Sequence, residues 1–211
     1  MSSPISNLQS PINCPNPVPC LSFPAHHDAK VGKYSRLILE EKTVSKEETI
    51  AQAKKLRRED QLEESQELLL ELLYDHPDDP QVLYEVGGSY DVLGEEPEAI
   101  PYYQQAIAAG LEGDDLQECL VCLGSSQRYV GEPEQAIATL QEAQEKFPGN
   151  HSAAVFLALA YYSEGQEDKA VKLLLELLLE TSNDENILAY RHALEYYKDH
   201  LDEEWSDEDE A

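Results

Sequence analysis

The chain has 211 residues, of which 15 are Lys or Arg and 43 are Asp or Glu, so its formal net charge is −28 at pH 7. A surface of this sign repels nucleic-acid phosphates and anionic lipids, which argues against both as partners, and no apolar run reaches the length of a membrane span. Residues 1–45 contain four basic and three acidic residues, so the acidic excess lies in 46–211.

The first 45 residues are predicted to form a Pro-rich arm outside the folded domain. The stretch SPINCPNPVPCLSFP, residues 10–24, has five prolines in fifteen residues and no helical period. Such a sequence buries too little apolar surface to offset the entropy of ordering it, so 1–29 is predicted to be disordered and 30–45 at most weakly ordered. No apolar stretch precedes Lys30, the first basic residue, so we expect no secretory signal and a reducing, cytoplasmic location.

From Lys46 onwards, four copies of one pattern follow one another. Each copy has a turn residue, and successive turn residues are 34, 37 and 34 positions apart: Asp60, Gly94, Gly131 and Gly165. Seven positions before the turn each copy has a small residue: Ala53, Gly87, Gly124 and Ala158. Five positions after it comes a second small residue: Ser65, Ala99, Ala136 and Ala170. Nine positions after it comes a large one: Leu69, Tyr103, Leu140 and Leu174.

Two antiparallel helices joined by a tight turn account for this pattern. Glycine at the turn tolerates a left-handed conformation, the small residues let the two helices cross closely, and the large residue fills the space beside them. Pro97 and Pro133 fit the first turn of a second helix, where the N–H that proline lacks has no partner. Because one pair cannot bury its apolar face alone, the pairs are expected to stack.

The helices are predicted, in chain order, at 46–58 and 61–75, at 80–93 and 96–109, at 114–130 and 133–147, and at 151–164 and 167–181. A ninth helix at 184–201 has apolar residues at helical spacing and is predicted to cap the last pair. The repeats span about 46–79, 80–113, 117–150 and 151–184 within a domain at 46–205, and 206–211 is predicted to be a solvated acidic tail. Pro101 lies beyond the first turn of its helix and is expected to remove one backbone hydrogen bond.

The pattern resembles the tetratricopeptide repeat family. The matching residues of the second copy are Leu83, Val86, Gly87, Tyr90, Gly94, Ala99, Tyr103 and Ala106. The stretches YDVLGEEPEAIPYYQQAIAAGL, LGSSQRYVG and VFLALAYYSEG are similar to one bacterial subgroup of small tetratricopeptide proteins. The resemblance implies an all-α fold, a right-handed α-α superhelix of four helix pairs plus a C-terminal capping helix. It also implies protein binding, without catalysis and without a cofactor.

The geometry of that family implies that the first helix of each pair lines a concave groove through repeat positions 2, 5, 9, 12 and 13. In this chain those positions hold basic, tyrosine and aliphatic residues, which is unusual for so acidic a protein. The candidate partner-binding residues are Lys54, Arg57, Arg58, Tyr84, Asp91, Arg128, Tyr129, Val155, Leu159 and Tyr162. The predicted function is an adaptor or scaffold that captures an extended or helical protein segment with basic flanks.

Two alternatives stay open for this surface. Arg128 and Asp91 have the same repeat position in neighbouring copies, so an ion pair between them would make Arg128 structural rather than partner-binding. The tyrosines would then pack between the repeats. The alternative function is weak self-association, in which an exposed end repeat stacks on a second copy of the chain.

The cysteines and histidines give weaker signals. Cys119 and Cys122 form a C-x-x-C in the middle of a predicted helix, whereas a redox motif needs a helix N-terminus to lower the thiol pKa. We therefore predict that both pack as structural thiols. A thiol or zinc activity in the arm would use Cys14, Cys20, His26 or His27, but the C-x5-C spacing is longer than that of usual zinc sites. No metal site is predicted.

Overall fold

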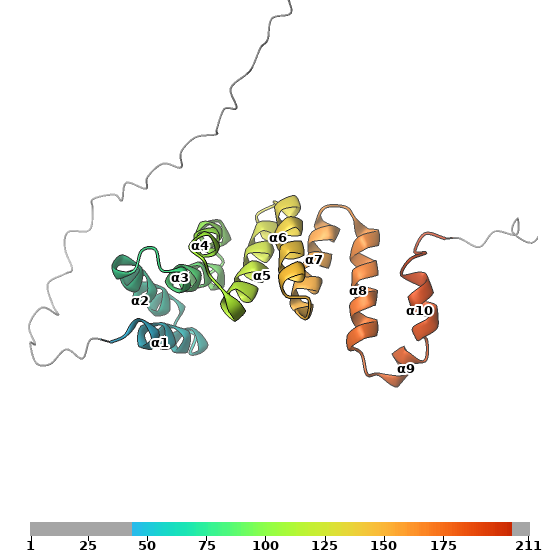
Figure 1. Ribbon diagram of the computed structural model, residues 1–211, viewed down its shortest axis with the longest axis horizontal. Helices are drawn as coiled ribbons and strands as arrows, with labels where there is room; N and C mark the ends of the chain where they lie inside the picture. Colours follow the sequence, from blue (N-terminus) through green and yellow to red (C-terminus); the bar gives the residue numbers. More distant parts are fainter. Residues whose placement is uncertain (1–43, 204–211) are drawn as a thin grey trace, which may run out of the picture. The chain divides into compact units, whose positions relative to one another are not determined.

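The computed structural model describes residues 44–203, and every regular element in this part of the chain is a helix (Figure 1). The helices are α1 (Lys46–Arg58), α2 (Leu62–Asp75), α3 (Pro80–Val92), α4 (Glu96–Ala108), α5 (Gly113–Tyr129), α6 (Pro133–Lys146), α7 (His151–Ser163), α8 (Glu167–Thr181), α9 (Glu185–Leu188) and α10 (Arg191–Tyr197). The all-α prediction is confirmed. The predictions for 1–43 and for the tail at 206–211 lie outside the described residues.

The first eight helices form four pairs, and each pair packs against the next along the chain. Their ends lie within one residue of the predicted ends. First helices of neighbouring pairs also contact one another: α5 contacts α3, and α7 contacts α5. No helix within 44–203 is long and apolar enough to cross a lipid bilayer.

The turn inside each pair has the left-handed conformation that its sequence predicts. Gly94, Gly131 and Gly165 have φ angles of 76°, 86° and 74°, and Asp60 has 61° at the same place in the first pair. Asp tolerates this conformation better than most residues. The turn position thus explains why three of the four copies have glycine there.

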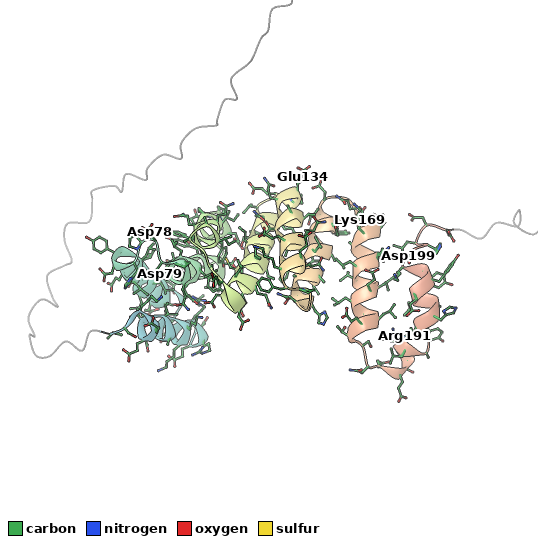
Figure 2. All side chains as sticks on the ribbon, viewed as in Figure 1. Asp78, Asp79, Glu134, Lys169, Arg191 and Asp199 are labelled. Carbon is green, nitrogen blue, oxygen red and sulfur yellow. The ribbon has the colours of Figure 1, made fainter. Side chains whose placement is uncertain are left out.

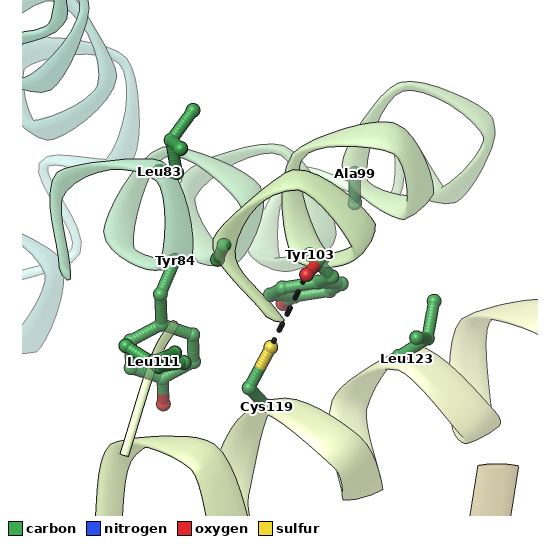
Figure 3. Close-up of a cluster of buried hydrophobic side chains, with 8 residues drawn as sticks. Leu83, Tyr84, Ala99, Tyr103, Leu111, Cys119 and Leu123 are labelled. Carbon is green, nitrogen blue, oxygen red and sulfur yellow. Dashed lines mark hydrogen bonds between the residues drawn. The ribbon is translucent and has the colours of Figure 1, made fainter. Parts of the chain in front are cut away.

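The small residues lie where the two helices of a pair cross. A Cβ atom added to Gly87 of α3 would come within 2.8 Å of the Tyr103 ring on α4, and one added to Gly124 of α5 would come within 2.5 Å of Leu140 on α6. Tyr103 is completely buried, and its carbonyl oxygen accepts a hydrogen bond of 3.8 Å from the Cys119 thiol (Figure 3). The core of the second pair therefore continues directly into α5.

This crossing predicts opposite effects for two adjacent glycines. Gly87→Ala should destabilise the fold by about 1–3 kcal/mol, because the new methyl group overlaps a buried ring. Gly88→Ala should stabilise it by up to about 1 kcal/mol, because alanine favours the helix and its Cβ would meet only the Arg57 guanidinium at 3.4 Å. Urea unfolding measures the change in the free energy of unfolding for each variant. Changes of the same sign in the two variants would contradict the close crossing of α3 and α4 at Gly87.

The prediction of a single capping helix at 184–201 is wrong. The segment forms two short helices, α9 and α10, with a break at Ala189 and Tyr190, and none of their residues is buried. The Arg191 guanidinium donates a hydrogen bond of 2.6 Å to the carbonyl oxygen of Leu179, in the last turn of α8. This bond holds the start of α10 against α8. The break at Ala189 and Tyr190 lets α10 take a different direction from α9. By contrast, α4 is continuous through Pro101.

Candidate functional site

The expectation that Tyr84 is exposed is wrong. Its side chain is buried in the core cluster with Tyr103 and Leu83 (Figure 3). Its hydroxyl group donates a hydrogen bond of 2.9 Å to the Glu118 carboxylate of α5. The next first helix, α5, therefore covers repeat position 5 of the second pair. Tyr84 links two repeats and is not available as an anchor for a partner.

Lys54 and Arg57 are engaged by a buried acid. Glu85 of α3 is only 2% exposed, and its Oε1 atom lies 2.6 Å from Lys54 Nζ. That contact lacks hydrogen-bond geometry, so it acts through charge alone. Its Oε2 atom accepts a hydrogen bond of 3.3 Å from Arg57. These two cations tie α1 to α3, whereas Arg58 is exposed on the outside of α1.

The alternative in which Arg128 pairs with Asp91 is not what the structure shows. Asp91 instead accepts hydrogen bonds from the Tyr103 hydroxyl group at 3.1 Å and the Ser126 hydroxyl group at 3.3 Å. Burial raises the pKa of the Asp91 carboxyl group, and these two hydrogen bonds oppose the shift. Within 44–203 no carboxylate lies within 4.0 Å of Arg128, whose buried Nε atom has no hydrogen-bond partner. Arg128 is therefore not held by an ion pair within this part of the chain.

Four of the candidate residues are exposed aromatic or aliphatic side chains on the contacting helices α5 and α7, and the three on α7 have the spacing of one helix face. Tyr129 and Tyr162 are 68% and 67% exposed, and Val155 and Leu159 are about two-fifths exposed. We call these four side chains the α5–α7 face. Val92 of α3 is also exposed, and its repeat position is that of Tyr129. The candidate set missed Val92, although the same spacing rule identifies it.

Cys119 and Cys122 are free thiols, as predicted. Burial raises their pKa values to about 12 and about 11, so both are protonated and weakly nucleophilic at neutral pH. Within 44–203 no group of three or more His, Cys, Asp or Glu side chains is placed to hold a metal ion. Cys14, Cys20, His26 and His27 lie outside the described residues.

Stacked helix pairs with small residues at each crossing define a helical-repeat protein. A family model described as tetratrico peptide repeat matches residues 80–201, which is more than half of the chain. The chain therefore belongs to the tetratricopeptide repeat family, and the resemblance inferred from its sequence is confirmed.

Similar proteins include a much longer enzyme. Aspartyl/asparaginyl beta-hydroxylase of Homo sapiens is 30% identical over 166 residues, which are 74% of this chain and 22% of the hydroxylase. The hydroxylase of Mus musculus is 29% identical over 140 residues, which are 63% of this chain and 19% of that protein. The chain thus spans about a fifth of the length of the curated relatives it matches.

Solved structures share the fold at lower identity. A tetratricopeptide repeat protein from Parabacteroides merdae has a TM-score of 0.58 at 20% identity, covering 73% of this chain and 59% of that one. MamA from Desulfovibrio magneticus RS-1 has a TM-score of 0.57 at 17% identity, covering 72% of this chain and 84% of that one. These likenesses establish the fold alone.

Proposed function

We propose that the chain is a non-catalytic protein-binding module that captures an extended or helical segment of another protein on the α5–α7 face. The observation that carries this proposal is the exposure of Tyr129 and Tyr162 beside Val155 and Leu159. Tyr84 and Tyr103, in contrast, are buried in the core. Tyrosines left in water beside aliphatic side chains supply the large, rigid contact area that dominates protein interfaces.

Arg128 and the acidic surface would select the partner. Arg128 has no carboxylate neighbour within 44–203, so its guanidinium group can donate to a backbone carbonyl or a carboxylate of the bound segment. The net charge of −28 attracts a segment whose flanks are basic. Binding should therefore have an apolar part that salt leaves largely unchanged and a charged part that weakens as salt is added.

The double variant Tyr129→Ser/Tyr162→Ser should lose its partner. Affinity capture from a lysate of the source cells with the wild-type chain identifies the protein, and titration then measures its dissociation constant. We expect the double variant to bind more weakly by about 2 kcal/mol, roughly thirtyfold, because each tyrosine buries a large side chain. Its melting temperature should change little, since both side chains are exposed.

Tyr74→Ser is the matched control. Tyr74 lies on α2 and is 88% exposed, so its loss removes surface tyrosine outside the α5–α7 face. The control should bind as the wild type does. If the Tyr129→Ser/Tyr162→Ser variant keeps full affinity, the α5–α7 face is not the binding site.

A further inference from the structure

The last helix pair leaves uncovered a side chain that the other pairs bury. The large residue nine positions after the turn is Leu69, Tyr103 and Leu140 in the first three pairs, and each is 0% exposed. The equivalent Leu174 of α8 is 42% exposed. Ala158, the small residue at the crossing beneath it, is buried as in the other pairs. The pair itself is therefore closed, and what is missing is the cover that a following pair would provide.

The same change occurs on α7. Repeat position 5 holds Ile50 and Tyr84 in the first two pairs, with exposed fractions of 5% and 8%. It holds Val121, which is half-buried, in the third pair and Val155, which is 38% exposed, in the last. In the second pair the next first helix provides the cover, because Tyr84 bonds to Glu118 of α5. No first helix follows α7 in that place. Two helices, α7 and α8, thus present unburied apolar side chains where a fifth first helix would lie.

The segment after α8 fills this position only in part. Figure 1 shows α10 beside α8, and the main contacts of α10 are with α8. Two ion pairs hold it there. Lys172 of α8 pairs with Asp199, which is labelled in Figure 2, and Lys198 pairs with Glu176 of α8. Cavities of about 420 and 370 Å³ remain between α8 and residues 198–203. The segment after α8 is thus held mainly by polar contacts, and it does not bury the apolar side chains of α8 as a further repeat would.

We propose that this end position, lined by Val155 and Leu159 of α7 and by Val171, Leu174 and Leu178 of α8, binds an amphipathic helix of another protein whose outer side is cationic. This inference rests on the proposed function and names the kind of segment that is captured. A helix is the expected occupant because the position of Leu174 is completely buried in every other pair, and each of those pairs packs against a helix of the next pair. The binding mode continues the repeat-to-repeat contact that holds the stack together.

Charge selects a cationic helix over a second copy of the chain. Three carboxylates lie at the α8 end of the position, because Glu167, Asp168 and Asp202 line the cavity beside Val171. Lys172 and Lys198 line the neighbouring cavity, but they pair with Asp199 and Glu176. Two copies would each bring a net charge of −28 to the contact, which opposes their association. Lysines at the edge of the apolar side of a partner helix would instead lie against these carboxylates, while its leucines and alanines cover Leu174 and Leu178.

The test uses a synthetic 17-residue peptide, the length of α5, with Leu and Ala at helical spacing and Lys elsewhere. A scrambled peptide of the same composition is the control for charge, and fluorescence anisotropy of a dye on the peptide measures binding to the full chain. We expect the amphipathic peptide to bind at least tenfold more tightly than the scrambled one. Equal binding of the two peptides would mean simple charge attraction and would overturn the proposal.

Variants then locate the peptide. Leu174→Gln/Leu178→Gln should weaken binding of the amphipathic peptide at least tenfold without changing the net charge, and Tyr74→Gln on α2 should leave it unchanged. Circular dichroism checks that the double variant is folded, and Leu178→Gln alone serves if it is not. Wild-type affinity in a folded variant would overturn the proposal. If Tyr129→Ser/Tyr162→Ser loses the captured partner and Leu174→Gln/Leu178→Gln retains it, this inference fails and the proposed function stands.

Two other occupants give distinct results, and either would overturn the proposal. A second copy would appear as a dimer in sedimentation of the wild-type chain that Leu174→Gln/Leu178→Gln abolishes. Residues 204–211 contain Trp205, the only tryptophan of the chain. Occupation by these residues would appear as a shift of the tryptophan emission when Leu174→Gln/Leu178→Gln is introduced without peptide. We expect a monomer and an unshifted emission.

Discussion

Replacing both Lys54 and Arg57 by methionine should destabilise the fold by about 3–5 kcal/mol, because Glu85 would remain buried without a cation. Glu85 is 2% exposed, so water cannot replace its two partners. Methionine keeps most of the side-chain volume, so the measured loss reports charge rather than packing. Urea unfolding followed by circular dichroism gives the free energy of unfolding.

The neighbouring cations of α1 provide the control. Lys55→Met/Arg58→Met removes the same net charge from the same helix, but Lys55 pairs with Glu59 at the exposed surface and Arg58 is exposed. Exposed pairs contribute little, so this variant should lie within about 1 kcal/mol of the wild type. Similar losses in the two double variants would contradict the assignment of Glu85 as a buried tie between α1 and α3.

Leu140→Ala should cost about 2–5 kcal/mol, and Leu174→Ala should cost less than about 1.5 kcal/mol, although both leucines have the same place in their repeats. Leu140 is completely buried against Gly124, so its loss leaves a cavity between α5, α6 and α7. Leu174 is exposed on one side, so water already contacts much of its surface. Thermal and urea unfolding at low protein concentration measures the difference.

An equal loss of stability in Leu140→Ala and Leu174→Ala would contradict the exposure of α8 at the end of the stack. It would show that Leu174 is covered in solution by something other than α9 and α10. Leu69→Ala, in the first pair, is a further control and should behave like Leu140→Ala, because it is buried to the same extent.

The helix pairs could be predicted from the sequence because their determinants are local and repeated. Each crossing needs a small residue, and each turn needs a residue that tolerates positive φ, at fixed distances along the chain. Gly87, Gly94 and Tyr103 satisfy these needs within one copy, and three other copies repeat them. Four repetitions of the same requirement fixed the helix ends to within one residue.

The individual site residues depended on contacts between repeats, which a spacing rule does not contain. Tyr84 is buried because Glu118 of the following pair accepts its hydroxyl hydrogen bond. Asp91 has the spacing to pair with Arg128, yet its carboxylate accepts hydrogen bonds from Tyr103 and Ser126 instead. The apolar spacing of 184–201 predicts one helix but contains no signal for the bond between Arg191 and Leu179 that accompanies its break.

Methyl NMR of the full chain, labelled at valine and leucine, tests the binding surface most directly when the captured partner is added. The account predicts that the methyl signals of Val155 and Leu159 shift or broaden, while those of Leu69 and Leu140 in the buried core stay in place. Parallel changes at Val171 and Leu174 would add the end position to the interface. Unchanged signals at both Val155 and Leu159 on saturation with the partner would contradict the account.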